Sequence, residues 1–126
     1  MKVLDTLIRV FVEREALDQT IRFYEDLYQE KCKARVYYEE LNLELAMIAR
    51  TVIIAGDAES RRLYESASAT ILVDSIQEAA VYLQQHGAVH LTEPKRTPRS
   101  WIMLVKHPDG LIAEYVELVH EQPSYT

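Results

Sequence analysis

The sequence predicts an α+β fold of two βαβββ modules whose strands form a curved mixed sheet around a cleft, with the helices outside. Two observations lead to this prediction. Apolar segments rich in β-branched residues alternate with segments of helical period in the order strand, helix, strands, and that order occurs twice. The two halves also resemble each other, LIRVFVEREALDQTIRFYEDL matching ATILVDSIQEAAVYLQQHG, as an internal repeat of roughly 60 residues.

The first half opens with a segment, residues 4–12, whose apolar and β-branched side chains predict a strand. A helix is expected over residues 15–29, because apolar side chains recur there at spacings of three and four. The side chains on this helix face are Leu17, Ile21, Tyr24, Leu27 and Tyr28. Residues 33–40, KARVYYEE, predict the next strand.

Residues 43–56 allow two interpretations, either two strands joined by a tight turn near Arg50 and Thr51 or one helix. The β-branched run TVII favours the strands. Residues 57–68 are polar and contain small side chains, which is typical of a connecting segment.

The second half repeats the order, with clearer signals for where each element begins and ends. Residues 69–73 predict a strand, and residues 76–85 predict a helix that Asp74 or Ser75 caps and that ends at His86 and Gly87. The remaining segments are strands over 88–91, 101–106 and 111–118, a basic loop over 93–100, an HPDG turn over 107–110 and a tail from 119 onward.

Composition sets the class of protein. The 126 residues predict one domain, with modules at about 1–60 and 66–120. The first residues do not resemble a signal peptide, and no apolar run is long enough to span a membrane. The single cysteine, Cys32, excludes an intrachain disulfide and fits a reducing cytoplasm. The net charge of −6 argues against binding to nucleic acid.

Two segments resemble the vicinal oxygen chelate superfamily, which includes glyoxalases, bleomycin-resistance proteins and extradiol dioxygenases. The first is LDTLIRVFV with the following helix, whose IRFYEDLY is similar to the F-Y pair of that family's opening helix. The second is GAVHLTEP with WIMLVKHPDGLIAEYVEL, which resembles the family's closing hairpin and its final strand with a glutamate. The resemblance covers residues 4–118 and implies the two-module fold.

The resemblance also implies where a metal site would lie, because the family takes one ligand from the first and one from the last strand of each module. Those positions fall on Asp5, or alternatively Thr6, on Ser68, on residues 52–55 and on Glu114. The segment 52–55 holds no acid, and serine is a poor ligand for transition metals. We therefore expect no transition metal and no cofactor, and only a hard-metal site with Asp5 and Glu114 stays open.

Strand alternation selects the candidate ligand-binding residues. In residues 4–12, the face with Thr6, Ile8, Val10 and Val12 is apolar and is expected to take the helices. Arg9 and Phe11 then face the cleft, where a guanidinium can hold a carboxylate, a phosphate or a carbonyl oxygen. Glu114 is the surviving family carboxylate, which either pairs with Arg9 or serves as a general base. Trp101, which follows a basic loop, either stacks on a ligand or belongs to a core or interface.

These residues favour a small-molecule binding or sequestration protein of the glyoxalase or bleomycin-resistance type. The alternative is a metal-dependent lyase, isomerase or dioxygenase of the same superfamily, in which Glu114 is the catalytic candidate. A structural or regulatory domain is the third hypothesis. We also expect a homodimer, because many apolar strands leave edges to be covered. Finally, we expect Arg9 and Glu114 to lie in one cavity.

Overall fold

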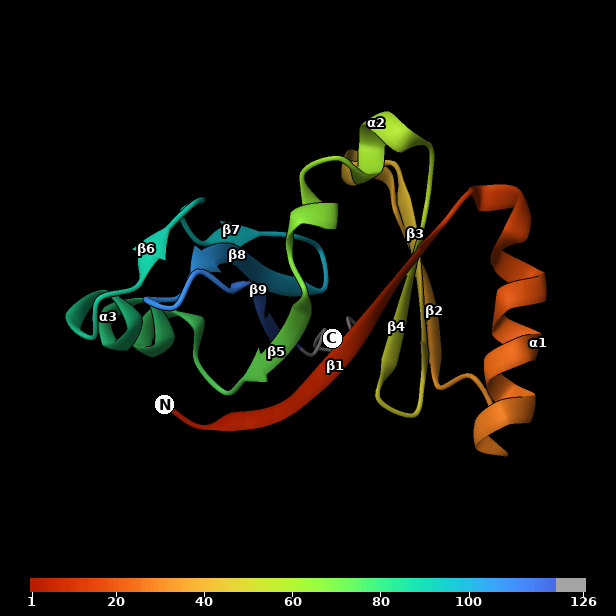
Figure 1. Ribbon diagram of the computed structural model, residues 1–126, viewed down its shortest axis with the longest axis horizontal. Coiled ribbons are helices and arrows are strands. Elements are labelled where there is room, and N and C mark those ends of the chain that lie inside the picture. The colour runs from red at the N-terminus through yellow and green to blue at the C-terminus, as the bar shows by residue number, and fades with distance from the viewer. Residues whose placement is uncertain (120–126) are drawn as a thin grey trace, which may run out of the picture. The chain divides into compact units, whose positions relative to one another are not determined.

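The computed structural model describes residues 1–119, and within them the chain forms nine strands and three α-helices (Figure 1). The first half contains β1 (Val3–Val12), α1 (Leu17–Tyr28), β2 (Ala34–Tyr38), β3 (Leu43–Ile48), β4 (Thr51–Ala55) and α2 (Ala58–Arg61). The second half contains β5 (Ala69–Val73), α3 (Ile76–Gln85), β6 (Val89–His90), β7 (Lys95–Arg96), β8 (Ser100–Lys106) and β9 (Ile112–Leu118). Short 3-10 turns at Arg14–Ala16, Glu39–Leu41 and Tyr64–Ser66 complete the connections.

The described chain divides into two compact units. The first-repeat unit is Leu7–Ser68, and the second-repeat unit comprises Met1–Thr6 together with the residues from Ala69 onward. Strand β1 therefore contributes its first residues to one unit and its later residues to the other.

The first-repeat unit contains the strand order β2-β3-β4-β1. Strands β2, β3 and β4 pair antiparallel, whereas β1 pairs with β4 in parallel, with Val10 opposite Ile53. Helix α1 runs alongside these strands (Figure 1) and buries Leu17 and Ile21 against them. The strand residues of this core are Ala46, Ile48, Ile53 and Ala55, with Val10 and Val12 packed at its edge. One face of the strands is thus covered by α1.

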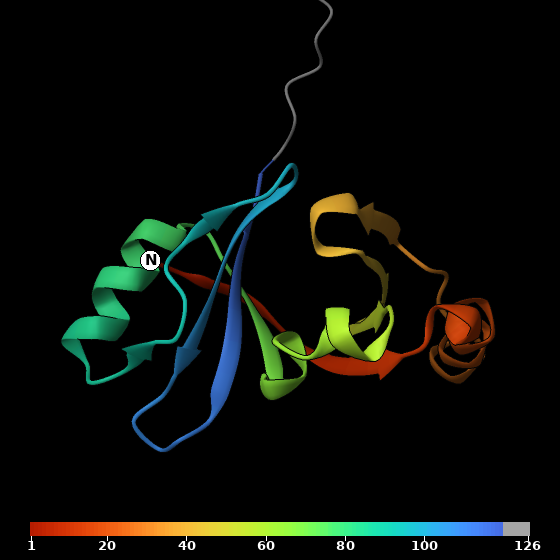
Figure 2. The same cartoon turned by 90° about the horizontal axis from the view of Figure 1, so that it is seen from above.

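The second-repeat unit repeats this pattern with the order β1-β5-β9-β8-β6, and β7 pairs with β8. Strands β5 and β9 are parallel, and β8 pairs antiparallel with β9. Helix α3 lies beside β8 and β9 (Figure 2). Its core consists of Val73, Ile76, Ala79, Ala80, Leu83, Ala88, Met103, Val105, Ala113 and Tyr115. The predicted α+β class, with a mixed sheet and two βαβββ halves, is confirmed, and the cleft stays a prediction.

The ambiguous segment 43–56 is two strands, as the β-branched residues predicted. Ile48 lies opposite Thr51 across a tight turn in which Ala49 has a positive φ of 51°. In a helix, residues 46 and 53 would lie on one side and residues 48 and 55 on the opposite side. In the hairpin, all four side chains point towards α1. The need to bury these side chains together decides the conformation.

Other boundaries differ in small ways from the predictions. Residues 93–100, expected as a loop, contain β7, and the connecting segment 57–68 contains α2. Both elements are too short to show a period in the sequence. The predicted helix over 15–29 begins at Leu17 after a 3-10 turn. In the second half the predicted start and end of the helix are confirmed. The Ser75 side chain caps α3, and Gly87 follows the end of α3 with a φ of 90°.

The described residues contain no helix that is both long and apolar enough to cross a membrane. Residues 120–126 lie outside the described part of the chain, and the predicted tail with them.

The core around α1 yields a stability prediction. We expect Ile53→Ala, at a side chain that is 0% exposed, to lower the free energy of unfolding by about 2–5 kcal/mol, because the substitution removes buried methyl groups and leaves a cavity. Urea denaturation measures this difference.

The matched control is Ile8→Ala on β1, because Ile8 is 62% exposed. It should cost less than about 1 kcal/mol. Equal losses for the two variants would contradict the burial pattern.

Candidate functional site

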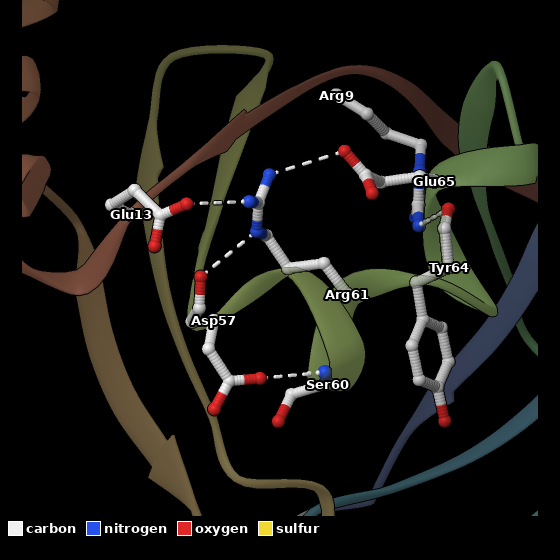
Figure 3. A network of polar contacts seen from close by, with 8 residues as sticks. Arg9, Glu13, Asp57, Ser60, Arg61, Tyr64 and Glu65 are labelled. Carbon is white, nitrogen blue, oxygen red and sulfur yellow. Dashed lines mark hydrogen bonds and ion pairs between the residues drawn. The ribbon is translucent and has the colours of Figure 1, made fainter.

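Arg9 is a buried cation on β1, with 9% of its surface exposed. Its Nη2 donates a hydrogen bond of 2.8 Å to the carbonyl oxygen of Tyr64 (Figure 3). Its guanidinium carbon also lies 5.2 Å from the centre of the Phe11 ring, within cation–π range. These two contacts fix the plane and the direction of the guanidinium within the first-repeat unit.

Strand alternation places Arg9 and Phe11 on one face of β1. Val10 and Val12 pack against the α1 core. The side chains of Arg9 and Phe11 therefore project from the opposite face of β1, as the alternation predicted. The prediction that Ile8 also packs under a helix is wrong, since its side chain is 62% exposed, and Thr6 is exposed too. Thr6 falls outside the unit that contains α1, and Ile8 lies near that boundary.

Arg61 holds the segment that supplies the Tyr64 carbonyl (Figure 3). Its Nε donates to the carbonyl oxygen of Gly56 at 2.8 Å, its Nη1 to Glu65 at 3.1 Å and its Nη2 to Glu13 at 2.9 Å. The side chain of Arg61 is only 12% exposed, so these contacts are partly shielded from water. Together they tie residues 58–66 to the ends of β1 and β4, and thereby set the position of the carbonyl that Arg9 contacts.

The sequence analysis missed Arg61, because residues 57–68 were interpreted as a plain connection. One signal was present, namely the spacing of four between Arg61 and Glu65, which is typical of ion pairs on a helix. The contacts with Gly56 and Glu13 depend on the fold, and no local pattern indicates them.

Asp57 begins the same segment by capping α2. Its Oδ1 accepts a hydrogen bond of 2.8 Å from the backbone nitrogen of Ser60. This bond, with a second from the Ser60 side chain and the positive charges of Arg14 and Arg61, lowers the pKa of the Asp57 carboxyl. The charged carboxylate therefore stabilises the start of α2.

Glu114 lies on β9 in the second-repeat unit and is 8% exposed. Its register partners are Thr70 on β5 and Leu104 on β8. Because Ala113 and Tyr115 belong to the core under α3, the Glu114 side chain projects from the face of β9 that α3 does not cover. Its position is thus comparable with that of Arg9 in the other unit, on the strand face opposite the helix.

The Trp101 side chain projects from the face of β8 and β9 that α3 covers, opposite to the face of Glu114. It is the register partner of Glu117, and it packs against the core that contains Met103 and Tyr115. The register is therefore incompatible with Trp101 and Glu114 lining one surface of these strands. The sequence interpretation of Trp101 as a core residue matches this packing.

The two repeats carry different residues on the strand faces that their helices leave uncovered. In the first-repeat unit, Arg9 is the register partner of Val52, and Phe11 is the register partner of Ile54. In the second-repeat unit, Thr70 is the register partner of Glu114. The placement of the family's first-strand ligand positions on Asp5, or alternatively Thr6, and on Ser68 stays a prediction.

The positions that the superfamily resemblance implies for a metal site are Asp5 or Thr6, Ser68, residues 52–55 and Glu114. They offer at most two carboxylates, those of Asp5 and Glu114, beside hydroxyl and apolar side chains. Such a set does not fit a transition metal, which needs three or four good donors. Asp5 lies in the other part of β1, where its Oδ1 accepts a hydrogen bond from its own neighbour Thr6. Over residues 1–119, His, Cys, Asp and Glu side chains form no group of three or more that could hold a metal ion.

Comparison with known proteins identifies the fold. No protein-family model matches the sequence, and no curated protein matches it. Among solved structures, an uncharacterized protein from Methanosarcina mazei is 32% identical, with a TM-score of 0.86 over 99% of this chain and 100% of that one. Methylmalonyl-CoA epimerase from Mycobacterium tuberculosis is 17% identical, with a TM-score of 0.70 over 94% of this chain and 90% of its own.

A third structure is a variant of Streptomyces coelicolor methylmalonyl-CoA epimerase in complex with 2-nitronate-propionyl-CoA. It is 18% identical, with a TM-score of 0.67 over 97% of this chain and 100% of its own. The chain shares the fold of these structures, which is the vicinal oxygen chelate fold that the opening helix and the closing hairpin predicted.

The Asp57 cap yields a pH prediction. Because its pKa is lowered in the folded protein, its stabilising contribution is complete above the pKa of an unfolded aspartate and is lost as the pH falls through the folded pKa. Asp57→Asn keeps a capping side chain but removes the charge. We expect wild type to be more stable than this variant at neutral pH, with the difference vanishing in acid, as measured by urea denaturation over a pH series.

Asp26→Asn, at an exposed position on α1, is the control and should show a smaller dependence on pH. A difference between wild type and Asp57→Asn that persists in acid would contradict the assignment.

Proposed function

We propose that this protein binds a small organic molecule through a carboxylate or a polarised carbonyl oxygen, with Arg9 as the anchoring residue and without a transition metal. The observation that carries the proposal is a guanidinium that is 9% exposed and held in one orientation by Tyr64 and Phe11. A fixed guanidinium presents its donors in a planar fork that matches a carboxylate.

The cost of burying Arg9 supports a functional interpretation. Removing a charged group from water costs several kcal/mol unless partners compensate for it. Two contacts in the first-repeat unit, a backbone carbonyl and an aromatic face, contribute to this compensation and orient the positively charged guanidinium. Such a positive charge attracts an oxyanion more strongly than a solvated arginine does, because water screens it less.

The Phe11 ring complements this charge in the proposed site. It is half-buried beside the guanidinium and offers an apolar surface for the body of a ligand. Pockets for small molecules combine such apolar walls with a few oriented polar groups. We propose Arg9 and Phe11 as the binding residues of the first-repeat unit.

We propose Glu114 as the binding residue of the second-repeat unit, on the strand face that α3 leaves uncovered. A buried carboxylate can accept hydrogen bonds from a ligand hydroxyl or amide. The expectation that Arg9 and Glu114 share a cavity stays a prediction. Trp101 contributes through the α3 core and is left out of this proposed site.

The solved relatives suggest a class of ligand. Methylmalonyl-CoA epimerase has been crystallised with methylmalonyl-CoA and with 2-nitronate-propionyl-CoA. Acyl-CoA thioesters carry a polarised carbonyl, and methylmalonyl-CoA adds a carboxylate. These compounds are therefore the first probes for a site anchored by an arginine.

The expected absence of a transition metal rests on the donor set at the positions that the superfamily resemblance implies, which are Asp5 or Thr6, Ser68, residues 52–55 and Glu114. Elemental analysis of protein purified without chelators tests it directly. We expect less than stoichiometric zinc, nickel, cobalt, manganese and iron, and a stoichiometric transition metal would overturn this part of the proposal.

A second candidate is a metal-free isomerase in which Glu114 moves a proton. The specific observation in its favour is a carboxylate that is 8% exposed, on a face of β9 opposite the core. A carboxylate in such a place can serve as a general base towards a carbon acid next to a thioester.

For assembly and location, we propose a homodimer in the cytoplasm. Within the second-repeat unit, Val89 on the edge strand β6 is 58% exposed, and a partner chain would cover such a surface. The lone Cys32 fits a reducing compartment.

The binding proposal predicts the effect of removing Arg9. We expect wild type to bind methylmalonyl-CoA more tightly than propionyl-CoA, which lacks the carboxylate. Arg9→Ala should weaken binding of methylmalonyl-CoA by about 10- to 100-fold, because a hydrogen bond to a charged group contributes roughly 1.5–3 kcal/mol. Arg9→Lys should recover only part of this loss, since lysine lacks the planar fork. Isothermal titration calorimetry measures the affinities.

Arg62→Ala is the matched control, because Arg62 is an exposed arginine in the same unit and should leave affinity unchanged. The proposal fails if Arg9→Ala binds as tightly as wild type. It also fails if neither thioester, nor any small organic acid in a thermal-shift panel, stabilises the protein.

The isomerase candidate predicts proton exchange. In D2O, wild type should incorporate deuterium at the carbon between the two carbonyl groups of methylmalonyl-CoA, and Glu114→Gln should reduce this rate by about 100-fold or more. Mass spectrometry follows the exchange. Binding of methylmalonyl-CoA without exchange above the uncatalysed rate would leave the binding function and reject this candidate.

A further inference from the structure

A cavity lies in the second-repeat unit between the end of α3 and the turn that joins β8 to β9. Its volume is about 340 Å³, near the lower end of the range for small-molecule sites. The lining residues that define its chemistry are Tyr82, His86, His107, Pro108, Asp109 and Tyr115. None of these residues belongs to the site proposed above.

Aromatic rings form the walls of this cavity. The rings of Tyr82 and His86 stack with their centres 4.1 Å apart, and His86 Nδ1 donates a hydrogen bond of 2.8 Å to the carbonyl oxygen of Tyr82. His107 Nε2 and the Tyr115 hydroxyl share a hydrogen bond of 2.6 Å. These contacts orient the four rings before any ligand arrives, which lowers the entropy cost of binding a flat molecule.

The two walls differ in exposure. Tyr82 is 49% exposed, whereas Tyr115 is 5% exposed. Burial, with a smaller effect from Tyr82, raises the pKa of the Tyr115 phenol, so this group is neutral and keeps its proton for hydrogen bonding. The cavity therefore runs from an accessible ring towards a buried polar pair.

The charge of the cavity is negative. Asp109 is the one carboxylate among the lining residues, all of which the structure describes, and none of them is lysine or arginine. The Asp109 Oδ1 accepts a hydrogen bond of 3.1 Å from the Leu111 nitrogen, which holds the carboxylate at the turn. The carboxyl end of α3 also meets the cavity, and the helix dipole makes that end partially negative.

From these features we infer that this cavity is a second binding site, specific for a small flat organic cation such as an arylamidinium or a protonated heteroaromatic amine. The ring of the ligand would stack on the Tyr82 and His86 rings, and its positive charge would face Asp109. Tyrosine faces attract cations through the ring quadrupole, so the walls and the charge favour the same class of ligand.

The register of β9 places this cavity and Glu114 on opposite faces of the strand. Tyr115 points to the α3 side, whereas its neighbour Glu114 leaves the opposite face of the strand. A ligand in the cavity therefore does not contact Glu114, and all the lining residues belong to the second-repeat unit. The two proposals concern ligands of opposite charge and can fail independently.

The experiment uses two probes with the same ring and opposite charge, benzamidinium and benzoate. We expect benzamidinium to shift the NMR ring signals of Tyr82, His86 and His107 with a dissociation constant on the order of 1 mM, as suits a fragment of this size. Benzoate should bind roughly fivefold more weakly or not at all, because Asp109 and the helix end repel it.

Two variants test the walls and the charge. Asp109→Asn should bring the affinities for the two probes to within about twofold of each other, because an exposed charge contributes about 1 kcal/mol or less. Tyr82→Ala should weaken benzamidinium binding by about fivefold or more, since a stacking face is lost. Their controls are Asp26→Asn and Tyr37→Ala. Tyr37 is also 49% exposed but lies on β2 in the other unit.

Several outcomes would overturn the inference. Equal affinity of wild type for benzoate and benzamidinium would reject the cationic class, and the absence of saturable shifts at the cavity residues with either probe would reject the site. Equal effects of Tyr82→Ala and Tyr37→Ala would show binding elsewhere on the surface. None of these outcomes depends on methylmalonyl-CoA binding, so the cavity and the proposed function are tested separately.

Discussion

Parallel pairing between the first and the last strand of each repeat is the constraint on which the rest of the structure depends. Strand β1 pairs with β4, and β5 pairs with β9, so each repeat must cross from one edge of its strands to the other. A helix makes the start of that crossover, and its apolar face covers one side of the strands. The helix leaves the opposite side of the strands uncovered. In the first repeat Arg9 lies on this side, and in the second repeat Glu114 does.

The two repeats use this constraint with different side chains. On the side that the helix leaves uncovered, β1 carries Arg9 and Phe11, and β9 carries Glu114. A guanidinium can bind an oxygen atom by hydrogen bonds, as a metal does by coordination.

A local network supports the buried side chain of Arg9. The guanidinium contacts the Tyr64 carbonyl, and Tyr64 lies on a segment that Arg61 ties to the strand ends through Gly56, Glu13 and Glu65. Arg61 is therefore a positioning residue that acts through the backbone. Preorganised donors of this kind bind more tightly than mobile ones, because less conformational entropy is lost on binding.

The sequence by itself determined the fold class, the order of elements, the caps of α3 and the alternation that separates Arg9 from Val10. These features depend on neighbours within a few residues, so their periodicity and turn chemistry are visible in the printed letters. Tertiary structure settled the choice between hairpin and helix at 43–56, for which the sequence favoured the hairpin. It also decided which of the open interpretations of Trp101 holds in the packing under α3, and it brought Arg61 to Gly56 and Glu13. Each of these depends on contacts or registers between segments distant in sequence. A shift of one residue in register moves a side chain to the other face of a sheet, and no local pattern reports that shift.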